Sequence, residues 1–256
     1  TATRKRIAGY YNSVQRVDAA VGMLKKALEQ PGQGERTLIN FLGDHGPPFS
    51  RGKTTCYEAG LRVPFFLRWP GETEPHVSDR FVSAVDIAPT IFDAVGIAAS
   101  DHIQGRSLRS VAKTNSDEHW RTHLVGEFHF HGASFFCPTR AITDGRYKLI
   151  KRLDRFRGRP IVSVDGDPAN RELEKMSGDH PADEWFGRVK NPPMVELYDL
   201  GSDPYEKIIR CEDDSLAVVV STLEMALDAR QAATDDPFRE AALCEQVAKR
   251  YLRTSR

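Results

Sequence analysis

The sequence has no apolar run long enough to cross a membrane and no excess of charge of either sign. A transmembrane helix needs about 20 consecutive apolar residues, and no stretch provides them. The 36 Lys and Arg residues are balanced by 36 Asp and Glu residues, whereas a nucleic-acid-binding domain usually shows a basic excess. We therefore expect neither a membrane nor a nucleic acid as partner. With 28% charged residues in 256, the composition is that of a globular chain of one large or two small domains.

Closely spaced cysteines are also absent. Cys56, Cys137, Cys211 and Cys244 are widely scattered, which disfavours a zinc ribbon or a thioredoxin-like site. Their even number permits disulfides, but a chain of this length does not need them, so free thiols are expected. The chain begins at Thr1 instead of Met, so its lack of a signal peptide says nothing about export.

The most informative stretch covers residues 37–64. The apolar run at 38–42 predicts a buried strand that ends in Gly43-Asp44-His45-Gly46. A second apolar run at 63–69 predicts another strand. In an open α/β sheet, ligands bind beyond the ends of such strands. The two strands therefore frame a loop that is a candidate site.

Three side chains in this loop have the right chemistry for a cation and an anion. Asp44 offers hard oxygen ligands for a divalent cation, and His45 suits manganese or zinc better than calcium. Lys53 supplies a compact positive charge for a tetrahedral oxyanion. Each residue taken singly is more often a turn or surface residue; it is their spacing after a strand that favours a site.

The motifs of this stretch resemble those of the sulfatase family, within the alkaline phosphatase superfamily. They are Asp44-His45-Gly46, Gly52-Lys53-Thr54 and Tyr57-Glu58-Ala59-Gly60-Leu61-Arg62-Val63-Pro64. The family pattern has Ser where this chain has Gly43, and Gly where it has Ala59. The resemblance implies that Asp44 and His45 bind the active-site cation, with Ca²⁺ expected and Mn²⁺ or Zn²⁺ as alternatives. It also implies that Lys53 contacts the sulfate.

The rest of the chain fits the same resemblance. Apolar spacing predicts an amphipathic helix over 4–30 and a second helix over 82–95, where Asp86 or a neighbour caps the helix as part of the scaffold. Short strands are expected at 124–130, 139–143, 146–150 and 196–200, and helices at 215–229 and 237–256. The fold class is α/β: residues 1–113 resemble the C-terminal part of an alkaline-phosphatase-like sandwich. Residues 114–256 resemble the small C-terminal α+β subdomain, an antiparallel sheet plus helix, with a long insertion near 152–193.

A second group of candidate residues lies in the first strand of this subdomain. Glu127, His129 and His131 alternate, so they are expected on one face of the strand. They suit a zinc site, a proton-transfer group, a sugar subsite or only the polar face of an edge strand. Their layout also resembles the sulfamidase branch, which cleaves N-sulfate from glucosamine in heparan sulfate. The nearby arginines suit a sulfated glycan or a solvated loop; they are Arg152, Arg155, Arg157 and Arg159.

The sequence lacks the Cys-x-Pro-x-Arg motif from which sulfatases make their formylglycine nucleophile. In Cys137-Pro138-Thr139-Arg140 the proline is adjacent to the cysteine, so this segment does not match. The resemblance therefore implies that the nucleophile belongs to an N-terminal half of the same enzyme. It further implies a periplasmic, secreted or lysosomal compartment, with a homodimer as an option.

The resemblance implies a hydrolase of sulfuric esters or sulfamates, with N-sulfoglucosamine of heparan-type glycans as the best single substrate. Three alternatives stay open. They are a phosphonate or phosphate ester hydrolase of the same superfamily, a non-catalytic fragment that binds sulfated glycans, and an unrelated α/β scaffold.

Overall fold

The computed structural model describes residues 1–114, 119–131, 135–153, 168–175, 187–188 and 191–254. The chain divides into two compact units. Unit 1 contains residues 1–43 and 64–121, and unit 2 contains residues 44–63 and 122–256. The loop with the candidate site therefore belongs to the same unit as the C-terminal part of the chain. The domain division expected from the sequence, 1–113 and 114–256, stays a prediction.

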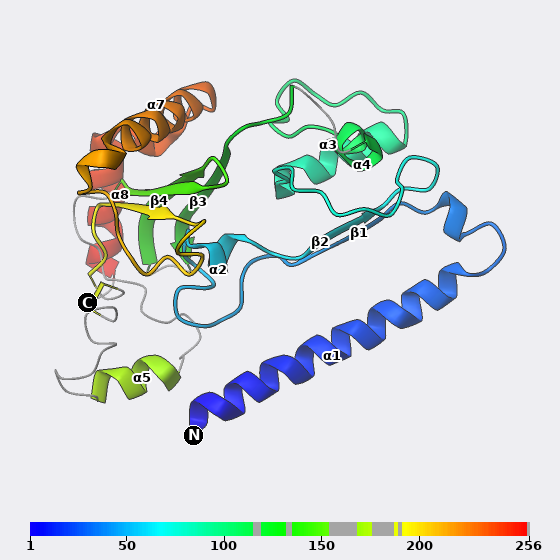
Figure 1. The fold of residues 1–256 in the computed structure, drawn as a ribbon, viewed down its shortest axis with the longest axis horizontal. Helices are drawn as coiled ribbons and strands as arrows, with labels where there is room; N and C mark the ends of the chain where they lie inside the picture. Colours follow the sequence, from blue (N-terminus) through cyan, green and yellow to red (C-terminus); the bar gives the residue numbers. More distant parts are fainter. Residues whose placement is uncertain (115–118, 132–134, 154–167, 176–186, 189–190, 255–256) are drawn as a thin grey trace. The chain divides into compact units, whose positions relative to one another are not determined.

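Unit 1 begins with the long helix α1 (Ala2–Leu28), followed by η1 (Gly34–Arg36) and two strands (Figure 1). Strands β1 (Ile39–Leu42) and β2 (Phe65–Arg68) pair antiparallel. The sequence predicted both strands to within three residues. The burial predicted for the strand at 38–42 was wrong, since β1 is only half-buried. No residue of α1 is buried either, among the described residues. A two-stranded sheet has too few neighbours to cover its faces.

The second half of unit 1 is built around a fully buried aspartate. Helices η2 (Ala84–Asp86), α3 (Ile87–Ala94) and α4 (Arg109–Thr114) follow β2. The Asp86 carboxylate, 0% exposed, accepts hydrogen bonds from the backbone N–H groups of Ser83 and Arg106 at 2.8 and 2.9 Å. The Arg121 guanidinium donates two more, at 2.7 and 2.5 Å. Asp86 is thus a structural residue, as the sequence predicted.

We expect the Asp86→Asn variant to be destabilised by about 3 kcal/mol, because it leaves the Arg121 charge without its partner. Thermal and urea unfolding measure the effect. The exposed residue Asp79 provides the control, since Asp79→Asn should stay within about 0.5 kcal/mol of wild type. Equal stability of the two variants would contradict the assigned role of Asp86.

Unit 2 contains a four-stranded antiparallel sheet in the order β3-β4-β5-β6. The strands are β3 (Leu124–His131), β4 (Phe135–Thr143), β5 (Tyr147–Arg152) and β6 (Val195–Asp199). The helical elements are α2 (Glu58–Leu61), α5 (Pro168–Lys175), η3 (Asp214–Leu216), α7 (Ala217–Ala233), η4 (Pro237–Arg239) and α8 (Ala241–Thr254). The antiparallel sheet with helices confirms the predicted α+β character of this part of the chain.

The two faces of this sheet have different coverings. Helix α7 lies over one face of the sheet (Figure 1). On this helix face, Leu149 and Leu197 pack against Leu223 and Leu227 of α7. On the loop face, the apolar cluster consists of Ala141, Ile150 and Tyr198 with Cys56 and Tyr57. Alternation along each strand sends neighbouring residues to opposite faces. The segment with the sulfatase-like motifs is therefore part of the core of unit 2.

The cysteines, the lack of a membrane span and the long insertion were predicted from the sequence of the whole chain. None of the four cysteines, all described, forms a disulfide, as predicted. Within the described part of the chain, no helix combines the length and the apolar character that a membrane span requires. The predicted insertion at 152–193 lies mostly outside the described residues, and so do Arg155, Arg157 and Arg159 of the basic cluster.

Candidate functional site

Asp44 and His45 follow β1 in the chain, and their side chains face each other. Nε2 of His45 is 3.2 Å from Oδ2 of Asp44, and the backbone N–H of His45 donates to Oδ1 of the same carboxylate at 2.9 Å. Nδ1 of His45 lies 2.9 Å from the carbonyl oxygen of Gly46. The Asp44 side chain is 86% exposed and the His45 side chain 41%, so both are accessible to a ligand.

The contact with Gly46 determines which nitrogen of His45 can bind a cation. A carbonyl oxygen only accepts hydrogen bonds, so Nδ1 carries the proton. In the neutral imidazole, Nε2 then presents its lone pair beside the carboxylate of Asp44. Metal-binding histidines commonly donate their other ring N–H to a backbone carbonyl in this way. The pair thus fits a divalent cation, although no group of three or more such ligands gathers within the described residues.

Residues 46–60 fold back on themselves in a tight loop. The N–H of Gly46 donates to the carbonyl oxygen of Gly60 at 2.9 Å, and the N–H of Lys53 donates to that of Pro47, also at 2.9 Å. A Cβ atom at position 46 would lie 1.7 Å from a backbone oxygen of the facing segment, so only glycine allows this approach. The loop returns Lys53 to the segment that follows the acid–histidine pair.

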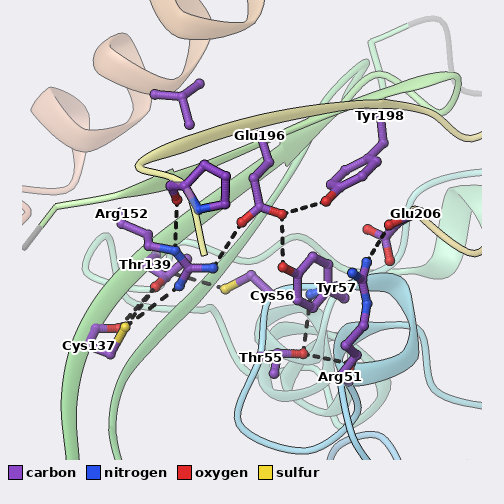
Figure 2. Close-up of polar contacts among 12 residues, drawn as sticks. Arg51, Thr55, Cys56, Tyr57, Cys137, Thr139, Arg152, Glu196, Tyr198 and Glu206 are labelled. Carbon is purple, nitrogen blue, oxygen red and sulfur yellow. Dashed lines mark hydrogen bonds and ion pairs between the residues drawn. The ribbon is translucent and has the colours of Figure 1, made fainter. Parts of the chain in front are cut away.

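Buried polar contacts attach this loop to the loop face of the sheet (Figure 2). The Tyr57 hydroxyl donates to Oε2 of Glu196 at 2.8 Å. The Arg51 guanidinium donates to the backbone oxygen of Glu206 at 2.6 Å and lies 3.6 Å from the centre of the Tyr57 ring. We call the residues on the sheet side of these contacts the anchor residues; they are Lys148, Arg152, Glu196, Tyr198 and Glu206.

Burial shifts the pKa of several groups beneath the loop. Burial and the Glu196 carboxylate raise the pKa of Tyr57 well above its usual value, so the phenol keeps its proton and donates it in the hydrogen bond. Burial also raises the pKa of Cys56 to about 12, which argues against Cys56 as a nucleophile near neutral pH. Burial raises the pKa of Glu206 too, and the neighbouring Lys148 charge opposes that shift.

The second group of candidates lies on the helix face of the same sheet. Oε2 of Glu127 is 3.3 Å from Nε2 of His129, and this contact lowers the pKa of Glu127. Glu127 is paired in register with Arg140, whose guanidinium binds Asp236 on the helix face at 2.7 and 2.8 Å. The His129 ring is 5.0 Å from that of Phe238 in η4. The structure therefore brings Glu127 and His129 together, but on the face opposite to Tyr57 and Cys56.

A β-bulge between Phe128 and Phe130 interrupts the register of β3. Simple alternation therefore does not extend from Glu127 to His131. Among the described residues, no metal-ligand cluster of three or more side chains forms here. The role of these residues in substrate binding stays a prediction.

No sequence pattern assigned a role to Lys148, Glu196, Tyr198 or Glu206. Arg152 was expected in a basic cluster that suits a sulfated glycan or a solvated loop, but its side chain is 15% exposed and bound to Glu196. Lys148 and Glu196 are each 1% exposed, within strands whose neighbouring residues are apolar. A charged residue in such a strand needs a buried partner. The opposite charges of Lys148 on β5 and Glu196 on β6 could have indicated buried ionic contacts. The sequence pattern alone does not indicate that the loop of residues 46–60 contacts them.

Comparison with known proteins shows which proteins this chain resembles. The family model described as Sulfatase matches residues 1–97. An "Ulvan-active sulfatase" of Formosa agariphila is 32% identical over 77% of this chain and 33% of its own length. The human "N-sulphoglucosamine sulphohydrolase" is 27% identical over 93% of this chain and 50% of its own length.

Solved structures share the fold. A protein in complex with its substrate D-glucosamine-2-N,6-O-disulfate superposes with a TM-score of 0.67 at 22% identity, covering 89% of this chain and 41% of that one. A phosphonate monoester hydrolase from Silicibacter pomeroyi gives 0.61 at 20% identity, covering 85% and 39%. At these identities, the comparison establishes a shared fold. Residues 1–97 match the sulfatase family, and most of the chain is similar to sulfatases. The chain spans between 33% and 50% of the length of the two curated relatives.

Proposed function

We propose that this chain is the cation- and sulfate-binding part of a sulfatase-type hydrolase that acts on sulfated glycans. The observation that carries the proposal is the Asp44–His45 pair, followed by a loop in which the N–H of Lys53 returns to the carbonyl oxygen of Pro47. N-sulfoglucosamine of heparan-type glycans is the best single substrate. The human relative of that name aligns with 93% of this chain, and a protein solved in complex with its substrate D-glucosamine-2-N,6-O-disulfate shares the fold.

In this proposal, Asp44 and His45 hold the cation, with Ca²⁺ expected before Mn²⁺ or Zn²⁺. The bound cation supplies positive charge that polarises the sulfate oxygens. The N–H at Nδ1 of His45 fixes the imidazole on Gly46, so that Nε2 stays directed toward the ligand. Lys53 binds the sulfate group and offsets the negative charge that develops in the transition state.

The nucleophile is proposed to be a formylglycine in an N-terminal half of the same enzyme, because these 256 residues contain no Cys-x-Pro-x-Arg motif. A periplasmic, secreted or lysosomal compartment is part of the same proposal, as is the option of a homodimer. A relative from Drosophila melanogaster, 35% identical over 38% of this chain, is described as an extracellular sulfatase.

A phosphonate or phosphate ester hydrolase is the second candidate, because phosphonate monoester hydrolases share the fold. A comparison of substrates distinguishes the two. N-sulfoglucosamine, an aryl sulfate and an aryl phosphonate are each incubated with the purified protein that carries this chain. We expect the sulfated compounds to be hydrolysed faster, with turnover lost in a chelator and restored by Ca²⁺.

Faster hydrolysis of the phosphonate would support the second candidate instead. Binding of a sulfated glycan without turnover of any of the three compounds would support a non-catalytic glycan-binding protein. Either result would overturn the proposed function.

A further inference from the structure

We propose that the buried carboxylates of Glu196 and Glu206 are positioning residues for the loop that carries Asp44, His45 and Lys53. They contact neither the proposed cation nor the sulfate; they act by holding the loop in the conformation that presents those three residues. This inference rests on the proposed function, in which Asp44, His45 and Lys53 bind the cation and the sulfate. Its structural basis is the set of contacts between the loop and the anchor residues.

Glu206 holds both sides of the segment 51–58. Its side chain is 3% exposed, and Oε2 accepts a hydrogen bond from the N–H of Glu58 at 2.7 Å. Its backbone oxygen accepts the 2.6 Å hydrogen bond from Arg51. Lys148 bridges the two carboxylates, with Nζ 2.8 Å from Oε1 of Glu58 and 3.2 Å from Oε1 of Glu206. Glu206, which follows β6 in the chain, thus holds the segment 51–58 in place.

The backbones of the two partners are also constrained. Arg51 has φ 63° and Glu206 has φ 54°, in the left-handed region that side-chain-bearing residues adopt at a cost. Such conformations persist where surrounding contacts impose them. The hydrogen bond between these two residues is a contact of that kind.

Glu196 forms the second attachment. Oε2 accepts hydrogen bonds from the hydroxyls of Tyr57 at 2.8 Å and Tyr198 at 2.5 Å. Oε1 accepts one from Arg152 at 2.9 Å. The Glu196 side chain is 1% exposed, so these three hydrogen bonds replace the water that would otherwise solvate its carboxylate. The carboxylate therefore fixes the Tyr57 ring, over which Arg51 lies.

A continuous path leads from these carboxylates to the imidazole of His45. Glu206 binds the N–H of Glu58, the first residue of α2. The carbonyl oxygen of Gly60, in the same helix, accepts the N–H of Gly46. The carbonyl oxygen of Gly46 accepts Nδ1–H of His45. Displacement of α2 would therefore move the group that orients His45.

The hydrogen bonds of Glu196 and Glu206 are directional, so we infer that they position the loop and do not only stabilise the fold. A buried ion pair is weak evidence for stability, since apolar residues of similar volume often stabilise as well or better. Apolar packing does not fix a loop by hydrogen bonds to particular backbone groups. Small displacements of catalytic groups can lower turnover by about a hundredfold.

The experiment compares Glu206→Ala, which removes the acceptor, with Glu206→Gln, which retains one, in the purified protein that carries this chain. Tyr57→Phe is a milder variant that removes only the hydroxyl bound to Glu196. Glu224→Gln is the matched control. Glu224 lies in α7, on the opposite face of the sheet from the loop, and its carboxylate is 3.4 Å from Nζ of Lys151. Ca²⁺ affinity is measured by calorimetry, at a temperature where circular dichroism shows each variant folded.

We expect Glu206→Ala to weaken Ca²⁺ binding by about 10-fold or more and to lower kcat. Glu206→Gln should recover part of the loss, and Tyr57→Phe should show a smaller loss than Glu206→Ala. Hydrogen exchange of residues 44–63 should become faster in Glu206→Ala, but not in Glu224→Gln. A folded Glu206→Ala variant with wild-type Ca²⁺ affinity, kcat and exchange would overturn the inference, as would a Tyr57→Phe variant that behaves like Glu224→Gln in all three.

The two proposals fail differently. If wild type neither binds Ca²⁺ nor hydrolyses any sulfated compound, the proposed function fails, whatever the exchange data show. If wild type binds Ca²⁺ and turns over sulfated substrate while Glu206→Ala does both equally well, only the positioning inference fails.

Discussion

Replacing Asp44 with alanine is expected to abolish cation binding and to lower turnover by about 10³-fold or more. Asp44 contributes the carboxylate that faces Nε2 of His45. Without it, the described residues offer a single imidazole, which is a poor ligand for a hard cation such as Ca²⁺. Calorimetric titration with Ca²⁺ and kcat for a sulfated substrate measure the two effects.

The exposed position of Asp44 makes this variant easy to interpret. Its side chain is 86% exposed, so its removal leaves no cavity and should change the melting temperature little. Asp79→Ala, at another exposed aspartate, is the control and should bind Ca²⁺ as wild type does. A fully active Asp44→Ala enzyme would disprove the assignment of the cation site.

Replacing Lys148 with methionine is expected to destabilise the protein by about 3–5 kcal/mol. Lys148 is 1% exposed and lies between the carboxylates of Glu58 and Glu206. Methionine fills a similar volume but leaves two carboxylates close together without the ammonium group. The loss is measured by urea unfolding at neutral pH.

Lys151 on the same strand gives a matched control. It points to the helix face and pairs with Glu224 at 3.4 Å, with side chains 30% and 37% exposed. Because partly exposed ion pairs contribute little, Lys151→Met should cost less than about 1 kcal/mol. Equal destabilisation by the two substitutions would show that the buried charge of Lys148 is not the cause.

The secondary structure of this chain follows closely from its sequence. Short strands were predicted at 139–143 and 146–150, and β4 and β5 form there as an antiparallel pair, with Thr143 opposite Lys148. The helix predicted over 4–30 is observed as Ala2–Leu28. Local signals suffice in these cases because turn residues and periodicity depend on neighbours in the chain.

Packing was less predictable than secondary structure. The apolar residues of α1 suggested a buried face, yet Tyr11 and Leu24 are 65% and 66% exposed. Periodicity reports that a helix has an apolar side, and not which element covers that side. In the same way, no residue pattern indicated that Tyr57 contacts Glu196, 139 positions later.

The candidate site was partly predictable. The motif around Asp44 and His45 identified the two residues, and their contact agrees with a shared ligand. The tautomer of His45 depends on a backbone oxygen, which no residue pattern reports. The sequence likewise does not indicate that the loop covers one face of the sheet while Glu127 and His129 lie on the other face.

The central claim is that these residues belong to a sulfatase-type hydrolase, and peptide mass spectrometry of the protein purified from its native source tests it most directly. We predict a formylglycine, derived from Cys or Ser in an activation motif, on the polypeptide that carries or accompanies this chain. If the only species found has the mass of these 256 residues and contains no formylglycine, the account is contradicted. Asp44, His45 and Lys53 would then belong to a protein without its own nucleophile.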